Sequence, residues 1–167
     1  MRTQRFGIEI EMTGLTRAKA AEVVARALWA ESLVHMGGSY DAYHILDLEG
    51  RTWKIVSDSS IEAQKVYGKT RHFANTEYRV ELVSPILTYK DIEPLQEIIR
   101  ELREAGAITN STCGIHIHID AAPHTPNTLK NLVNLVASKE DLLYKALQID
   151  YDRIKYCKKL NEQLIQT

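Results

Sequence analysis

The amino-acid sequence predicts an α+β fold in which helices back one face of a mostly antiparallel sheet. Two observations predict it. Short runs alternate strictly between apolar and polar residues, as strands do, and longer runs repeat apolar residues at helical spacing. The chain has 167 residues, 44% of them hydrophobic, and shows no repeat or linker, so we expect a single domain over residues 1–167.

The first predicted strand covers residues 6–12. Its apolar side chains share one face, and Glu9 and Glu11 share the other. A turn then leads to Thr16, which can cap a helix whose apolar residues recur from Ala20 to Leu28, and Gly37-Gly38 breaks the helical pattern.

Residues 43–48 and 52–56 predict a hairpin, and the polar turn that follows it contains Asp58. The next strand is predicted over residues 77–84, before Pro85. Its alternation places three charged residues on one face: Glu77, Arg79 and Glu81.

A second helix is predicted over residues 89–105, because its apolar residues recur every three or four positions. A third helix opens at Pro126, and Ser138 resembles a capped restart. Four apolar residues of this third helix are expected to be buried: Leu129, Leu132, Val133 and Val136.

Between these two helices lies a strand with the order Ile-His-Ile-His-Ile, residues 115–119. We expect its isoleucines to be buried and His116 and His118 to face the same side as the strand glutamates. Carboxylates and imidazoles gathered on one sheet face predict a site for a divalent cation, with the carboxylate pKa values raised without the cation. Taken singly, each run also fits an ordinary solvated strand face.

Composition narrows the function classes. The 21 basic and 22 acidic side chains leave a formal charge of −1, which disfavours nucleic acid as a partner. The sequence shows no signal-peptide pattern and no apolar run long enough to span a membrane. Cys113 and Cys157 are the only cysteines, so we expect reduced thiols in a cytoplasmic protein.

Four motifs, in order, resemble those of the putative amidoligase family, which is distantly related to glutamine synthetase and glutamate–cysteine ligase. They are Phe-Gly-Ile-Glu-Ile-Glu at residue 6, Trp53 through Asp58-Ser59-Ser60, Val-Glu-Leu-Val-Ser-Pro at residue 80, and Gly-Ile-His-Ile-His at residue 114. The resemblance extends to Tyr156-Cys157-Lys158, although the family usually has Gly where Ser59 stands.

The resemblance implies a half-barrel or funnel like that of glutamine synthetase. It also implies an ATP- and Mg²⁺- (or Mn²⁺-) dependent ligase that joins a carboxylate to an amine through an acyl phosphate. Residues 1–167 would be the N-terminal part of such a catalytic domain, since family members continue into a further segment. We therefore expect this chain alone to bind cations, to bind ATP weakly and to lack ligase activity.

Carried over by position, Glu9, Glu11 and Glu81 match metal ligands of the family. His116 or His118 matches a histidine that touches metal or nucleotide phosphate, and Asp58 resembles the acid that positions or deprotonates the amine. For Arg79, two roles stay open: it could bind a carboxylate or phosphate during catalysis, or form a structural ion pair with Glu77 or Glu81.

Other site classes fit less well. A closed zinc site prefers nitrogen and sulfur ligands, which this face offers too few of. A catalytic Cys–His pair of Cys113 and His116 is excluded because the two side chains point to opposite faces of a strand. The serious alternative is a non-catalytic half-domain that binds metal or nucleotide or acts as an interaction module. The resemblance implies substrates that are small-molecule or peptide carboxylates and amines, without naming them. An open half-barrel would expose a sheet edge, and proteins usually cover such edges, so a homo-oligomer is one possible state.

Overall fold

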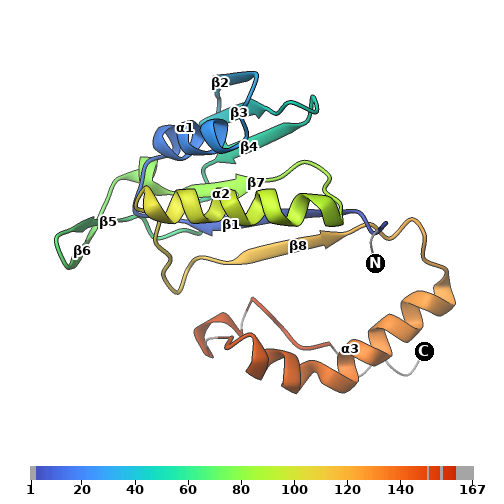
Figure 1. Ribbon diagram of the computed structural model, residues 1–167. Helices are drawn as coiled ribbons and strands as arrows, with labels where there is room; N and C mark the ends of the chain where they lie inside the picture. The colour runs from blue at the N-terminus through green and yellow to red at the C-terminus, as the bar shows by residue number, and fades with distance from the viewer. Residues whose placement is uncertain (1–2, 150, 155, 161–167) are drawn as a thin grey trace. The chain divides into compact units, whose positions relative to one another are not determined.

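The computed structural model describes residues 3–149, 151–154 and 156–160 (Figure 1). It divides the chain into two compact units, Met1–Asp120 and Ala121–Thr167, which are treated separately below.

The first unit is built on a six-stranded sheet with the order β2-β3-β4-β7-β1-β8. Every neighbouring pair in it is antiparallel. The strands are β1 (Phe6–Met12), β2 (Ser32–Gly37), β3 (Ala42–Leu46), β4 (Thr52–Val56), β7 (Val80–Val83) and β8 (Ile115–Ile119). A separate hairpin consists of β5 (Gln64–Tyr67) and β6 (Thr70–Phe73).

Helices α1 (Arg17–Ala27) and α2 (Ile92–Glu104) lie on one face of the sheet (Figure 1). Trp53, Ile55 and Leu82 from the strands are fully buried in the same cluster as Val24 and Ile98 from the helices. Burying each such side chain contributes about 1.5–3 kcal/mol. This layer leaves the opposite face of the sheet free of helices within the first unit.

The connection from β1 into α1 depends on a close backbone approach. Gly14 has φ +92°, and a Cβ placed on it would lie 2.4 Å from the carbonyl oxygen of Gly106. Thr16 then caps α1 by accepting a hydrogen bond from the Lys19 N–H at 3.2 Å, as predicted. The chain therefore reverses tightly at the end of β1, which brings α1 back over the sheet.

The predicted α+β class and the antiparallel sheet are confirmed, while three details differ. Strand β2 and the β5–β6 hairpin are additional to the predicted elements. Residues Thr76–Tyr78 form a short 3₁₀ helix, so β7 begins only at Val80 and Glu77 does not share its alternation. The half-barrel or funnel that the resemblance implies is wrong for the part of the chain that the structure describes, where the sheet is open and neither closed nor curled.

The predicted burial of the β8 isoleucines is wrong. Ile115, Ile117 and Ile119 are 63%, 62% and 53% exposed. The physical reason is the position of β8, which is the edge strand of the sheet beyond β1 (Figure 1). The core formed with α1 and α2 ends at the half-buried Ile8 and Ile10 of β1.

The second unit contains α3 (Pro126–Ala146) and a 3₁₀ turn, Tyr151–Arg153. The predicted restart at Ser138 is wrong: the helix is continuous there, and the Ser138 hydroxyl donates to the Leu135 carbonyl at 2.8 Å. The four apolar residues expected to be buried are not, since no residue of α3 is buried. Among the described residues, no helix has both the length and the apolar character that a membrane span requires.

A candidate metal centre on the open face of the sheet

Strand register brings the predicted site residues together. Glu9 on β1 pairs with His116 on β8 on one side and with Val83 on β7 on the other. Val83 in turn pairs with Lys54 on β4. Because paired residues of antiparallel strands share a face, these side chains form one row on the face opposite α1 and α2.

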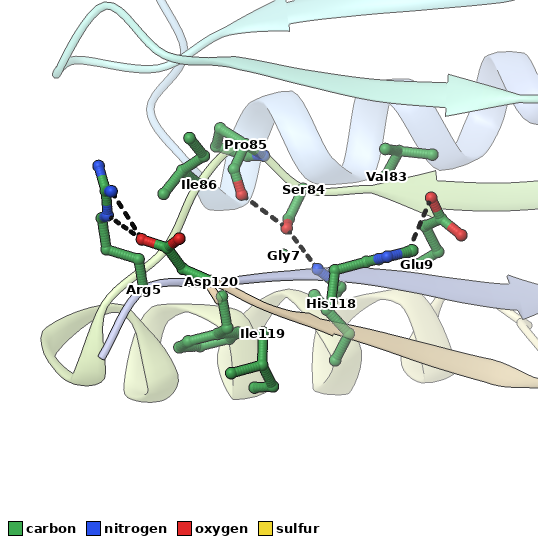
Figure 2. Close-up of a pocket in the computed structure, with 12 residues that line it drawn as sticks. Arg5, Gly7, Glu9, Val83, Ser84, Pro85, Ile86, His118, Ile119 and Asp120 are labelled. Carbon is green, nitrogen blue, oxygen red and sulfur yellow. Dashed lines mark hydrogen bonds and ion pairs between the residues drawn. The ribbon is translucent and has the colours of Figure 1, made fainter. Parts of the chain in front are cut away.

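Glu9 lies between the two histidines of β8. One of its carboxylate oxygens is 3.1 Å from His116 Nδ1, and the other is 3.3 Å from His118 Nε2. Figure 2 shows His118 reaching Glu9 across the sheet surface. Glu9, Glu81 and His116 each offer a ligand atom, and these atoms lie within 4.8 Å of one another.

A second group stands beside the first and shares Glu81 with it. Glu11, Asp58 and Glu81 also place three carboxylate oxygens within 4.8 Å of one another. Glu11 is only 4% exposed, and its Oε2 accepts a hydrogen bond from the Gly114 N–H at 2.6 Å. Glu11 therefore holds the start of β8 in place as well as contributing a carboxylate.

Asp58 enters this cluster from the turn after β4. Its Oδ1 accepts a hydrogen bond from the Ser60 N–H at 2.7 Å, which orients the carboxylate. The sequence singled out Asp58 by motif resemblance only. Its closeness to Glu11 and Glu81 depends on how the turn crosses the end of the sheet, which strand alternation does not report.

The electrostatics of the two groups are unequal. Burial, followed by the charges of Glu9, Asp58 and Glu11, raises the pKa of Glu81 to about 7. Burial also raises the pKa of Glu9, but hydrogen bonds with His116 and His118 outweigh it, so the pKa of Glu9 is lowered. The expected rise in carboxylate pKa is thus confirmed for Glu81 and wrong for Glu9, because both imidazoles hydrogen-bond to Glu9, whereas the charge of His116 only partly offsets burial and the neighbouring carboxylates at Glu81.

Arg79 directly precedes β7, and its Nε is buried without a hydrogen-bond partner among the described residues. The structural ion pair with Glu77 or Glu81 is absent from the part of the chain that the structure describes. Its backbone carbonyl accepts a hydrogen bond from the Arg17 guanidinium at 3.0 Å. A buried, unsatisfied guanidinium nitrogen is costly, so this group is suited to meeting an anion.

A cavity of about 370 Å³ adjoins the Glu9–His118 pair (Figure 2). Ser84 lies in its wall, where its hydroxyl accepts from the Ile8 N–H at 2.9 Å and donates to the Pro85 carbonyl at 2.8 Å. At its far end Arg5 and Asp120 form an ion pair at 2.6 Å. Ser84, Arg5 and Asp120 were not predicted as site residues, although Ser84 ends the predicted strand 77–84 and Asp120 directly follows the predicted strand 115–119.

The residues present suit a hard divalent cation. Carboxylate oxygens dominate both groups, and Mg²⁺ and Mn²⁺ favour oxygen ligands. The mutual repulsion that raises the pKa of Glu81 is the effect that a bound cation would relieve.

The antiparallel sheet carries helices on one face and, on the other, two clusters of metal-ligating side chains that share Glu81. These features define a candidate cation-binding α+β protein. The chain belongs to the family described as "Putative amidoligase enzyme", whose model matches residues 2–167. Comparison with curated proteins and with solved structures gives no match.

Proposed function

We propose that this chain supplies the metal-binding strands of an ATP-dependent carboxylate–amine ligase. One observation carries the proposal: two clusters of metal-ligating side chains share Glu81 on the sheet face that no helix of the first unit covers. Membership of the amidoligase family agrees with it.

Glu9, Glu11, Glu81 and His116 would hold Mg²⁺ or Mn²⁺, with His118 beside them through its contact with Glu9. When bound, such cations offset the repulsion between nucleotide phosphates and an anionic substrate.

The proposed reaction has two steps. A substrate carboxylate oxygen attacks the γ-phosphorus of ATP, and the bond to the bridging oxygen breaks, which releases ADP and forms an acyl phosphate. The amine nitrogen then attacks the acyl carbon, inorganic phosphate leaves, and the nitrogen loses a proton.

The chain's own side chains have separate tasks in this scheme. The Asp58 carboxylate, already oriented by the Ser60 N–H, can accept the amine proton. The Arg79 guanidinium, with its unpaired Nε, can bind a carboxylate or phosphate oxygen. The cavity bounded by Ser84, Pro85 and His118 can hold an organic part of the nucleotide or substrate.

Cationic groups on this face are few in the described part of the chain. Lys54 shares the row of Glu9, and Arg79 stands next to Glu81's strand. Phosphoryl transfer requires positive charge around the phosphates beyond the metal. We therefore propose that this chain by itself binds cations, binds ATP weakly and does not turn over.

The same scarcity of basic side chains on this face favours the second candidate, a non-catalytic module that binds metal or nucleotide. The two candidates differ in whether ADP is formed. The test combines calorimetric titration of a non-hydrolysable ATP analogue, with and without Mg²⁺, and an ADP-release screen against pools of carboxylates and amines.

Cation-dependent nucleotide binding that is lost in Glu81→Gln and kept in Glu77→Gln supports the shared site. Glu77 is a suitable control because it is exposed and lies outside both carboxylate groups. ADP formation that depends on both substrates supports the ligase, although it overturns the prediction that this chain is inactive alone. Nucleotide binding that needs no cation in the parent chain would contradict the ligase, because its metal ions would have to contact the nucleotide phosphates.

A further inference from the structure

Strand β8 leaves one backbone edge of the sheet without a neighbour in the described structure. The even-numbered residues that flank β8 bond toward β1: the Asp120 N–H donates to the carbonyl of Arg5, just before β1, and the Gly114 carbonyl accepts from the Glu11 N–H, each at 3.0 Å. Backbone groups alternate in direction along a strand. The N–H and C=O groups of Ile115, Ile117 and Ile119 therefore point outward, away from β1.

The same three residues also expose their side chains, each more than half accessible. Native edge strands are usually protected by a charge, a proline, a bulge or a covering element. β8 has no lysine or proline and pairs with β1 in regular register over all five residues. Within the first unit as described, this edge is regular, apolar on one face and free of lysine and proline, which suits it to pairing with another strand.

The sequence of β8 identifies a strand that fits it. Ile-His-Ile-His-Ile reads the same in both directions, so two copies in antiparallel orientation are complementary about Ile117. In that register Ile117 lies opposite Ile117 of the partner subunit, and Ile115 lies opposite Ile119 of the partner subunit. Every outward-pointing residue then meets another outward-pointing residue, as hydrogen-bonded antiparallel pairs require.

Strand β2, at the other edge of the sheet, lacks this property. Its order Ser-Leu-Val-His-Met-Gly is not symmetric, and its register shifts between His35 and Gly37. Such an irregularity disrupts pairing along an edge. Self-complementarity is thus confined to β8 among the two edge strands of this sheet.

We propose that β8 is a homodimerisation strand, pairing with β8 of a second copy across a two-fold axis perpendicular to the sheet. The two six-stranded sheets then form one continuous antiparallel sheet. Three pairs of residues form across the axis, each exchanging two hydrogen bonds, and the isoleucines of both copies line one face.

The dimer has two structural consequences. A two-fold axis perpendicular to the sheet keeps both carboxylate clusters on the same face, and it sets His116 opposite His118 of the partner subunit. On the other face, Ile115 borders a cavity of about 620 Å³ whose lining includes Ile10, Ile99 and Leu102. Ile119 of the partner subunit then covers the exposed flank of Ile115.

The first test is the mass of the purified chain by sedimentation velocity. The parent chain is expected to be a dimer, and Ile117→Lys a monomer, because two lysines would face each other on the axis. Since Ile117 is 62% exposed, the thermal melt of the variant should show a folded protein. The matched control is Val34→Lys on the other edge strand, at a residue 49% exposed, and it should stay dimeric.

The second test fixes the register. In a background with Cys113→Ser and Cys157→Ser, Ile117→Cys should form a disulfide-linked dimer under mild oxidation, since the paired Cα atoms would be about 5.5 Å apart. Ile115→Cys alone should not, because its partner position is 119, whereas Ile115→Cys combined with Ile119→Cys should. A monomeric parent chain, a dimer that persists in Ile117→Lys, or equal crosslinking by the single variants at 115 and 117 would overturn the proposal.

Discussion

Glu11 on β1 and Glu81 on β7 lie directly opposite each other in the antiparallel sheet. Like charges at directly opposed positions destabilise a strand pair. Here the repulsion is increased, because the Asp58 carboxylate lies beside both glutamates and the charge of Glu9 also acts on Glu81. Such a concentration of negative charge on one sheet face lowers stability unless a cation or a proton neutralises it.

The first prediction concerns stability and pH in the absence of metal. The pKa of Glu81 is raised to about 7, so the folded state binds a proton more tightly than the unfolded state. The stabilisation from this proton is fully present below 4.5, the ordinary pKa of a glutamate, and is lost as pH rises through about 7. The free energy of unfolding, measured by urea denaturation at several pH values in this range, should fall as pH increases.

Glu81→Gln should flatten that pH dependence, because the amide resembles the protonated carboxyl at every pH. Above pH 7 the variant should be more stable than the parent by about 1–3 kcal/mol, an order-of-magnitude figure from the size of the shift. Equal pH dependence in parent and variant would show that Glu81 is not the titrating group.

The second prediction concerns cation affinity and pH. A cation competes with the proton on Glu81, so the rise in melting temperature caused by Mg²⁺ or Mn²⁺ should grow as pH increases through about 7. Differential scanning fluorimetry over this range measures it. An effect of the same size at pH 5 and pH 8 would place the cation elsewhere.

The third prediction separates Glu9 from Glu81. Hydrogen bonds with His116 and His118 lower the pKa of Glu9 despite its burial, so its charge is compensated in the folded state. Glu9→Gln should therefore keep the fold and bring none of the stabilisation expected from Glu81→Gln, while weakening cation-dependent nucleotide binding. Chemical denaturation with calorimetry on both variants tests this, and an unfolded Glu9→Gln would instead make Glu9 a structural residue.

The fourth prediction compares two isoleucines that have the same alternating sequence pattern. Ile55→Ala should cost about 2–5 kcal/mol through the cavity it leaves, because Ile55 is fully buried. Ile117→Ala should cost less than about 1 kcal/mol at protein concentrations where the chain is monomeric, because Ile117 is largely exposed. Comparable losses in the two variants would mean that β8 is covered in solution.

These two isoleucines also show what the sequence can and cannot predict. Alternation assigned β1 and β8 correctly as strands and placed Glu9 and His116 on a common face, since side-chain direction is a local property of a strand. Burial is not local. Whether an apolar strand face is covered depends on where the helices end, and α1 and α2 do not extend to β8.

The candidate site has the same division. Glu9, Glu11 and Glu81 could be grouped from alternation, but their register could not, because it depends on how β7 pairs with β1. The hydrogen bond from the Gly114 N–H to Glu11 joins residues distant in sequence, and no local pattern predicts it. Strand β2 was missed because its apolar residues are mostly exposed and lack a clean alternation.

Calorimetric titration of Mn²⁺ into the metal-free chain tests most directly whether the two side-chain clusters that share Glu81 form a cation site. The parent chain and Glu77→Gln should bind Mn²⁺ alike, and Glu81→Gln should lose binding, since it removes a ligand from both groups at once. No binding by the parent chain, or undiminished binding by Glu81→Gln, would contradict the assignment of this face as a metal centre.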